Sequence, residues 1–206
     1  MISREPHTST DRPDTGGDTR GEGWPQRLER ARQERNHREM ARLLLDGADT
    51  AMAQADAEIE ADEGISDGES LERVQWLLAR AQRSLDACGL HPECLTLQCE
   101  LMERQCRLSR QWARLGHPGQ HHVARELVRD QAFEVARRAE RTPDLGLRVA
   151  VILRAAETLD ALGDLGDAHA LRARAFHRLG SANACASAPH LTQGTSLPGG
   201  VLRTYQ

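Results

Sequence analysis

The sequence predicts an all-α fold built from stacked antiparallel helical hairpins. Of its 206 residues 39% are hydrophobic but only 3% are aromatic, and β-branched residues are scarce, whereas sheet proteins draw on both classes. Ala, Leu, Arg and Glu dominate, and all four are good helix formers. Apolar residues recur at helical spacing between Gly and Pro breaks, which predicts about seven helices. Short connections make consecutive helices antiparallel neighbours, and many small Ala residues on the apolar faces favour stacked hairpins.

The folded part is expected to span residues 24–180, between two disordered tails. Residues 1–23 contain almost nothing apolar and cannot offset the entropy lost on ordering. Residues 181–206 are rich in Ser, Ala, Gly and Pro, so they are also expected to be disordered. The folded part divides into arginine-rich and acidic N-terminal helices over 24–68 and core hairpins over 69–180.

Two helices are expected in the N-terminal part. Pro25 suits a first helical position and Gly47 a C-terminal stop, which predicts a helix over about 25–45. Its early turns alternate Arg and Glu and its apolar residues gather late, so it is expected to be a solvated arm that docks only at its end. A second helix, acidic and rich in Ala, is predicted over about 50–61, followed by a glycine-containing loop.

The core helices show sharper patterns. Ser70 is the expected N-cap of the first, with Arg73 three residues later, so the capping box is half present. The helix that starts at Pro92 carries two adjoining apolar faces, which indicates that it lies between neighbours on both sides. The predicted core helices span about 70–88, 92–115, 121–141, 145–162 and 167–179.

One stretch, 149–179, resembles a tetratricopeptide repeat, whose pattern is W-x2-L-G-x2-Y, a turn, then A-x3-F and a later Pro over about 34 residues. Arg172 stands where that family has an aromatic residue, and Pro92 and Pro143 lie 51 residues apart rather than one repeat length. The resemblance implies a short right-handed array of helix pairs with a groove for a peptide or a partner helix. The matching positions are Ile152, Ala155, Ala156, Leu159, the turn 162–165, Ala168 and Ala175.

The charge distribution excludes some functions. All 27 basic residues are Arg and the net charge is −4, so no Lys is present for Schiff-base chemistry. There is also no overall attraction to nucleic acid or an anionic membrane. Residues 47–72 hold nine acids and no Arg, whereas 73–206 carry a net charge of +5. Such a run is usually solvated, and the alternative is that it folds over the protein's own basic part as an autoinhibitory segment.

The function expected from these features is a cytoplasmic protein–protein interaction module, adaptor or chaperone-like, that binds a peptide or helix of a partner protein. No signal-peptide pattern or apolar run of about 18 residues is present. No catalytic motif such as G-x-S-x-G or H-E-x-x-H occurs, so no enzyme and no cofactor is expected. Guanidinium groups suit carboxylates, and the candidate partner-binding residues are Arg107, Arg114, Arg148 and Arg154.

Two alternatives remain open. Cys88, His91 and Cys94 have metal-ligand side chains around a predicted turn, and a His of the 117–122 stretch could complete a tetrahedral zinc site. Against this, buried cysteine behaves as a small hydrophobe. The Arg-rich helix over 27–42 could follow phosphates, but Glu alternates with Arg and no aromatic residue is interleaved, which argues against nucleic-acid binding.

Overall fold

The computed structural model describes residues 23–61 and 68–187. Over these ranges it is all-α with no strand, which confirms the predicted fold class. Segments 1–22 and 188–206, which carry the tail predictions, lie outside the described residues. The seven described helices are α1 (Trp24–Gln33), α2 (His37–Glu60), α3 (Glu69–Ala87), α4 (Pro92–Arg114), α5 (Pro118–Ala139), α6 (Leu145–Ala161) and α7 (Leu165–Ser187).

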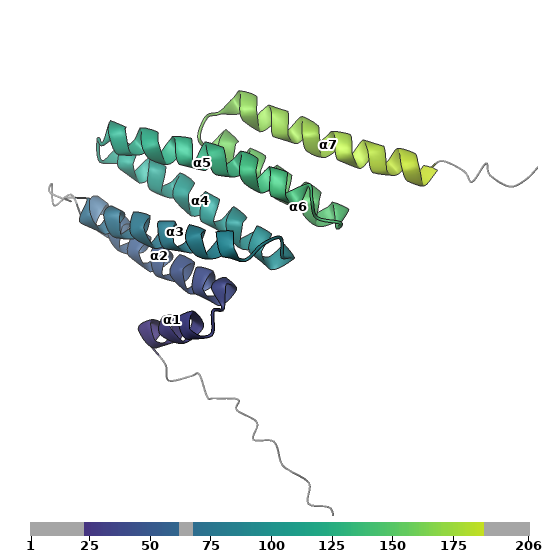
Figure 1. Cartoon of the computed structure of the whole chain (residues 1–206). Helices are drawn as coiled ribbons and strands as arrows, with labels where there is room; N and C mark the ends of the chain where they lie inside the picture. Colours follow the sequence, from purple (N-terminus) through teal and green to yellow (C-terminus); the bar gives the residue numbers. More distant parts are fainter. Residues whose placement is uncertain (1–22, 62–67, 188–206) are drawn as a thin grey trace, which may run out of the picture.

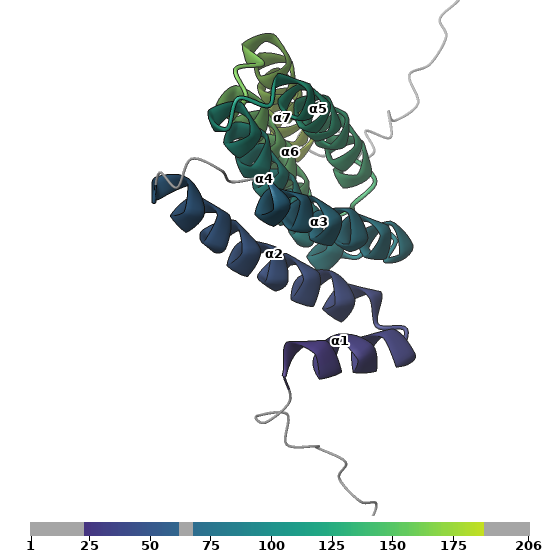
Figure 2. The ribbon, with the colours of Figure 1, turned by 90° about the vertical axis from the view of Figure 1, so that its left-hand side faces the viewer.

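The helices from α2 onward pair into hairpins that stack along one direction (Figure 1). Helix α2 packs on α3, α4 on α5 and α6 on α7, and the second helix of a hairpin packs on the first helix of the next. Helices α2, α4 and α6 also contact one another in succession, so they form one layer of the stack. Helix α1 lies at one end and α7 at the other (Figure 2), so the described helices form an open array rather than a closed bundle.

Helix α4 joins two hydrophobic clusters. One of its faces contributes Leu95, Cys99 and Met102 to a cluster with α5, α6 and α7. The other contributes Leu101 and Leu108, among others, to a cluster with α2 and α3. This confirms the two apolar faces expected from the sequence, and it explains why α4 has neighbours on both sides.

The break between the first two helices was predicted in the wrong place. The chain turns at Arg35, whose φ is 52°, and Asn36 caps α2 by accepting a hydrogen bond from the Glu39 N–H at 3.1 Å. Helix α2 then runs through Gly47, so this glycine is not a stop.

Gly47 has a packing role instead. The indole of Trp24 lies against it, and a Cβ at position 47 would lie 3.0 Å from Trp24 Cζ2. The indole Nε1–H donates a hydrogen bond to the carbonyl oxygen of Leu43 at 2.7 Å. Helix α1 therefore docks on α2 through its first residue, and Ala31 in its last turn is also buried, so α1 is not a solvated arm that docks only at its end.

Three other boundaries differ from the prediction. The N-cap of α3 is Gly68 rather than Ser70. Its φ is 73°, and a Cβ there would lie 2.9 Å from Cζ3 of Trp112, so only glycine fits. Helix α5 begins at Pro118, since Pro is tolerated in a first turn. Helix α7 passes Gly180 and ends at Ser187, so the first residues of the expected tail are helical.

We predict that Gly47→Val expels the Trp24 indole and releases α1. The free energy of unfolding should fall by about 1–3 kcal/mol, the range for overpacking, and the amides of α1 should lose protection from hydrogen exchange. Gly119→Val is the matched control, because nothing lies within 4 Å of a Cβ at that helical glycine. Equal protection of α1 in both variants would contradict this account of Trp24.

Candidate functional site

Ion pairs between neighbouring hairpins hold part of the acidic run. Asp49 of α2 accepts two hydrogen bonds from the guanidinium of Arg104 of α4, at 2.8 and 2.6 Å. Asp56, two turns further along the same face of α2, pairs with Arg107 of α4. The acidic helix therefore docks on the protein's own basic residues, as a structural part of the stack.

All four arginines proposed as partner-binding residues are engaged within the chain. Arg107 pairs with Asp56, and Arg154 of α6 pairs with Glu103 of α4 at 2.7 Å. The other two make local contacts: Arg148 donates to the carbonyl oxygen of Thr142 at 2.6 and 3.2 Å, and Arg114 donates to Gln111 Oε1 at 3.2 Å. Sequence reasoning selected arginines whose carboxylate or carbonyl acceptors are already present in the fold.

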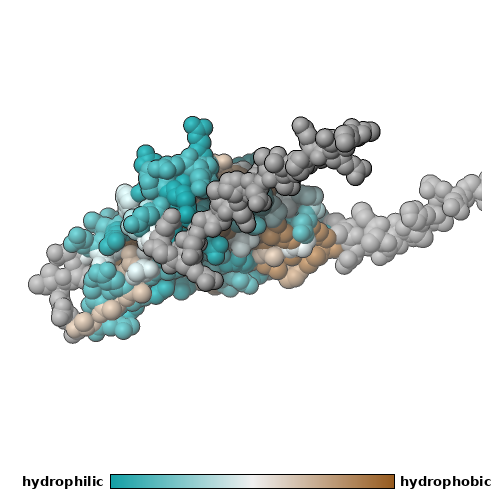
Figure 3. Space-filling view, turned by 90° about the horizontal axis from the view of Figure 1, so that it is seen from below, coloured by the Kyte–Doolittle hydropathy of each residue, from teal (hydrophilic) through white to brown (hydrophobic). Residues whose placement is uncertain are grey.

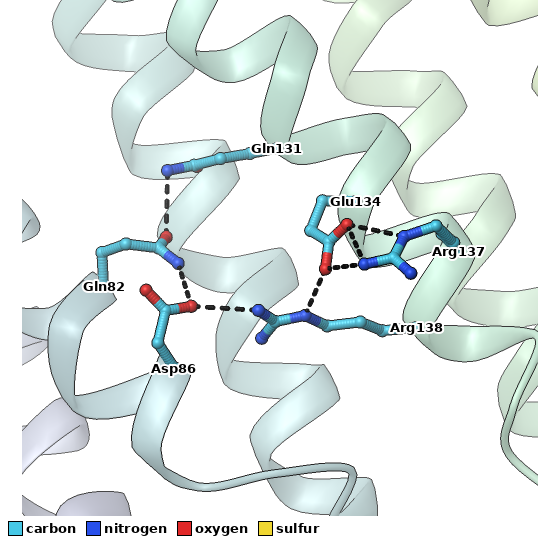
Figure 4. Close-up of polar contacts among 6 residues, drawn as sticks. All are labelled: Gln82, Asp86, Gln131, Glu134, Arg137 and Arg138. Carbon is cyan, nitrogen blue, oxygen red and sulfur yellow. Dashed lines mark hydrogen bonds and ion pairs between the residues drawn. The ribbon is translucent and has the colours of Figure 1, made fainter.

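Polar contacts also join α3 to α5 (Figure 4). Gln131 Nε2 donates to Gln82 Oε1 at 2.9 Å. Arg138 bridges Asp86 of α3 at 3.1 Å and Glu134 of its own helix at 2.8 Å. The hydrogen bond from Arg138 is the main reason that the pKa of Glu134 lies below its usual value.

A similar contact joins α5 to α7. Glu140 accepts from Arg174 at 2.5 Å and from Arg178 at 3.4 Å. The hydrogen bond from Arg174 is the largest contribution that lowers the pKa of Glu140. When it is ionised, the Glu140 carboxylate therefore stabilises the contact between α5 and α7.

The proposed zinc ligands do not form a metal centre. Within residues 23–61 and 68–187, no group of three His, Cys, Asp or Glu side chains is placed to hold a metal ion. His91 caps α4, because its Nδ1 accepts the Glu93 N–H at 3.3 Å. Cys94 is buried in the hydrophobic cluster at 2% exposure. Burial, with a smaller contribution from Cys94, raises the pKa of Cys88 to about 12, so without a metal its thiol is protonated.

Two histidines at the start of α5, His117 and His121, also have structural contacts. His121 Nδ1 lies 2.8 Å from the carbonyl oxygen of Ser109 and 3.0 Å from its Oγ. A ring nitrogen that donates to a carbonyl carries the proton, so it cannot act as a base toward that hydroxyl. His117 packs edge-on against Trp112, with ring centroids 5.4 Å apart. This pair of contacts secures the α4–α5 turn rather than forming a catalytic dyad.

A cleft of about 460 Å³ lies between α1, α2 and α3, and we call it the Trp76 cleft. The docking of Trp24 on Gly47 builds one wall, and α3 builds the other. The Trp76 side chain is 52% exposed, although it is large and apolar. The residues lining the cleft are Trp24, Leu28, Gly47, Thr50, Ala51, Gln54, Arg73, Trp76, Leu77 and Arg80.

The arginines of this cleft differ from those between the hairpins. The Arg80 guanidinium lies 4.6 Å from the centroid of the Trp76 ring, a cation–π contact. Neither Arg73 nor Arg80 forms an ion pair with a carboxylate among the described residues. The cleft is therefore lined by two indoles and by two guanidinium groups that form no ion pair within the described residues.

The position of Trp76 in the sequence is a signal for this cleft. The buried apolar stripe of α3 includes Leu71, Val74 and Leu77. Trp76 lies outside this stripe, so its large aromatic side chain faces outward. Much of the described surface is otherwise hydrophilic in the view from below, where hydrophobic residues gather toward the right-hand side (Figure 3).

Comparisons with known proteins give no further guide. No protein-family model, no curated protein and no solved structure significantly matches this chain. None of the described helices combines the length and apolar character that crossing a membrane requires.

The lowered pKa of Glu140 predicts an acid-sensitive contribution to stability. A carboxylate whose folded pKa is depressed stabilises the fold above its unfolded pKa, and this contribution is lost as the pH falls through the folded pKa. The difference in unfolding free energy between the native chain and Glu140→Gln should therefore be constant near neutral pH and shrink below about pH 4.5.

Urea denaturation from pH 7 to pH 3 measures this difference. Glu157→Gln is the matched control, because Glu157 is exposed and forms no ion pair within the described part of the chain. A pH profile for Glu140→Gln that parallels the native profile would show that the Arg174 contact does not stabilise the fold.

Proposed function

We propose that this chain is a protein-binding module, adaptor or chaperone-like, that holds a segment of a partner protein in the Trp76 cleft. The observation that carries the proposal is a cleft lined by two indoles and by two arginines that form no ion pair with a carboxylate of the described residues, one of which, Arg80, lies over the Trp76 ring. The proposed partner segment has an apolar or aromatic anchor side chain flanked by carboxylates. The partner is the one expected from the sequence, a peptide or helix. The proposed binding residues are those of the Trp76 cleft instead of the four arginines named from the sequence.

The apolar part of the cleft favours an anchor side chain. Trp and Arg are the residue types most enriched at binding hot spots, and Trp76 has more than half of its side chain exposed. Covering that surface together with Leu28 gains on the order of 1–3 kcal/mol. The Trp24 indole is already held by its bond to Leu43, so little conformational entropy is lost there on binding.

The charged part of the cleft sets the spacing of the partner's acids. Arg73 and Arg80 are seven residues apart on α3, or about 10 Å along the helix axis. A partner helix with Asp or Glu two turns apart matches this spacing. The guanidinium fork donates two parallel hydrogen bonds to a carboxylate, so each contact also fixes orientation.

The Arg-rich N-terminal helices are less suited to nucleic acid. Arg27 pairs with Glu39 at 3.3 Å, and Arg38 pairs with Glu93 at 2.5 Å. Side chains that already contact carboxylates have to give up those contacts before they can bind phosphates. We therefore favour a protein partner, and we propose no enzymatic activity and no cofactor.

The tetratricopeptide resemblance stays a prediction. The first helices of successive hairpins begin at His37, Pro92 and Leu145. These intervals exceed the family's repeat of about 34 residues. A cytoplasmic location is likewise part of the proposal.

Peptide selection against the full chain tests the proposed function. Random twelve-residue peptides displayed on phage should yield sequences in which a Trp, Phe or Leu stands near Asp or Glu, because both cleft features contribute to binding. Trp76→Ala, Arg73→Glu and Arg80→Glu should each weaken the selected peptides by at least about 10-fold in fluorescence anisotropy.

Arg83→Glu is the matched control for the charge reversals. Arg83 lies on the same helix, donates to the carbonyl oxygen of Ala79 at 3.4 Å and does not line the cleft. Selected peptides that bind the Arg73 and Arg80 variants as tightly as the native chain would refute the proposed site.

A further inference from the structure

A second and smaller cleft lies on another side of α3, between α3, α4 and α5, and we call it the α3–α5 cleft. Its volume is about 100 Å³. Leu78 of α3 and Leu108 of α4 are 1% and 3% exposed and form its inner walls. Val123 and Leu127 of α5, which are 58% and 47% exposed, stand at its mouth. The cleft is therefore apolar and open on one side.

One buried polar side chain lies among these apolar walls. Gln105 of α4 lines the cleft and is only 4% exposed. Its Oε1 accepts no hydrogen bond from any described residue. A buried acceptor without a donor is destabilising, so the amide favours a ligand that brings a donor. The terminal torsion of a glutamine is soft, and the amide turns readily toward such a group.

Two further amides stand at the exposed positions of the lining. Gln75 of α3 and Gln120 of α5 line the cleft from opposite sides. Their side chains form no hydrogen bonds within the described residues. Each amide offers both a donor and an acceptor, which suits the backbone of a bound chain segment.

We propose that the α3–α5 cleft is a recognition pocket for one tyrosine side chain of a partner protein. The ring packs between Leu78, Leu108 and Leu127, and the phenolic O–H donates to Gln105 Oε1. An enclosed cavity of about 150 Å³ holds a benzene ring. This cleft has about 100 Å³, so a ring fits only with part of its surface left in the open mouth between Val123 and Leu127. A phenylalanine would leave the Gln105 acceptor without a donor, and an indole is larger than the space.

This pocket is distinct from the Trp76 cleft. Arg73, Trp76 and Leu77 line the Trp76 cleft, whereas Gln75, Leu78 and Ala79 of the same helix line the α3–α5 cleft. The inference therefore does not depend on the proposed function, and each cleft has its own variants.

The test uses p-cresol and toluene, which differ by one hydroxyl group, with the full chain. Titrations followed by the methyl NMR signals of Val123 and Leu127 give the affinity of each probe. Replacing Gln105 by Met keeps the length of the side chain and removes the acceptor. We expect Gln105→Met to weaken p-cresol relative to toluene by about 3- to 10-fold, the value of one hydrogen bond.

Two further variants separate the outcomes. Leu127→Asp places a charge at the mouth and should abolish the binding of both probes, whereas Trp76→Ala should leave both affinities unchanged. An unchanged p-cresol to toluene ratio in Gln105→Met would overturn the assignment of the donor contact. If neither probe shifts the Val123 and Leu127 signals of the native chain, the α3–α5 cleft is not a binding pocket for an aromatic ring.

Discussion

The packing of α4 between two hydrophobic clusters sets the geometry of the stack. Leu95, Cys99 and Met102 face the α5–α7 side, while Leu101 and Leu108 face the α2–α3 side. A helix that is apolar on two faces cannot lie at the surface. The neighbouring hairpins therefore have to approach it from opposite sides, which makes an array and leaves the clefts along α3.

Arginine serves two purposes in this molecule. Between hairpins it pairs with carboxylates, as in Arg104 with Asp49 and Arg154 with Glu103, and these contacts link layers that the apolar clusters already hold. On the outer surface of α3, Arg80 lies over the ring of Trp76 and forms no ion pair with a described carboxylate. The two groups of arginines differ in whether the fold places a carboxylate beside the guanidinium group.

The helices with regular apolar spacing could be predicted from the sequence, together with the two faces of α4. The break at Arg35 could not, because Gly47 has the local appearance of a helix stop and its real reason is the ring of Trp24, far away in the chain. The roles of the arginines were hidden for the same reason. The acceptor of Arg107 lies 51 residues away and that of Arg104 lies 55 residues away. Trp76, by contrast, could have been found, because it departs from the stripe of its own helix.

The ion pairs between hairpins depend on pH in one direction, because their cationic member is arginine. The pairs named above use a guanidinium group, which stays protonated from neutral pH to about pH 12. Mildly alkaline solution therefore leaves these links charged, whereas acid weakens them by protonating the carboxylates. Reagents that acylate amines also find no lysine to neutralise, so acetyl transfer to side-chain amines cannot loosen the stack.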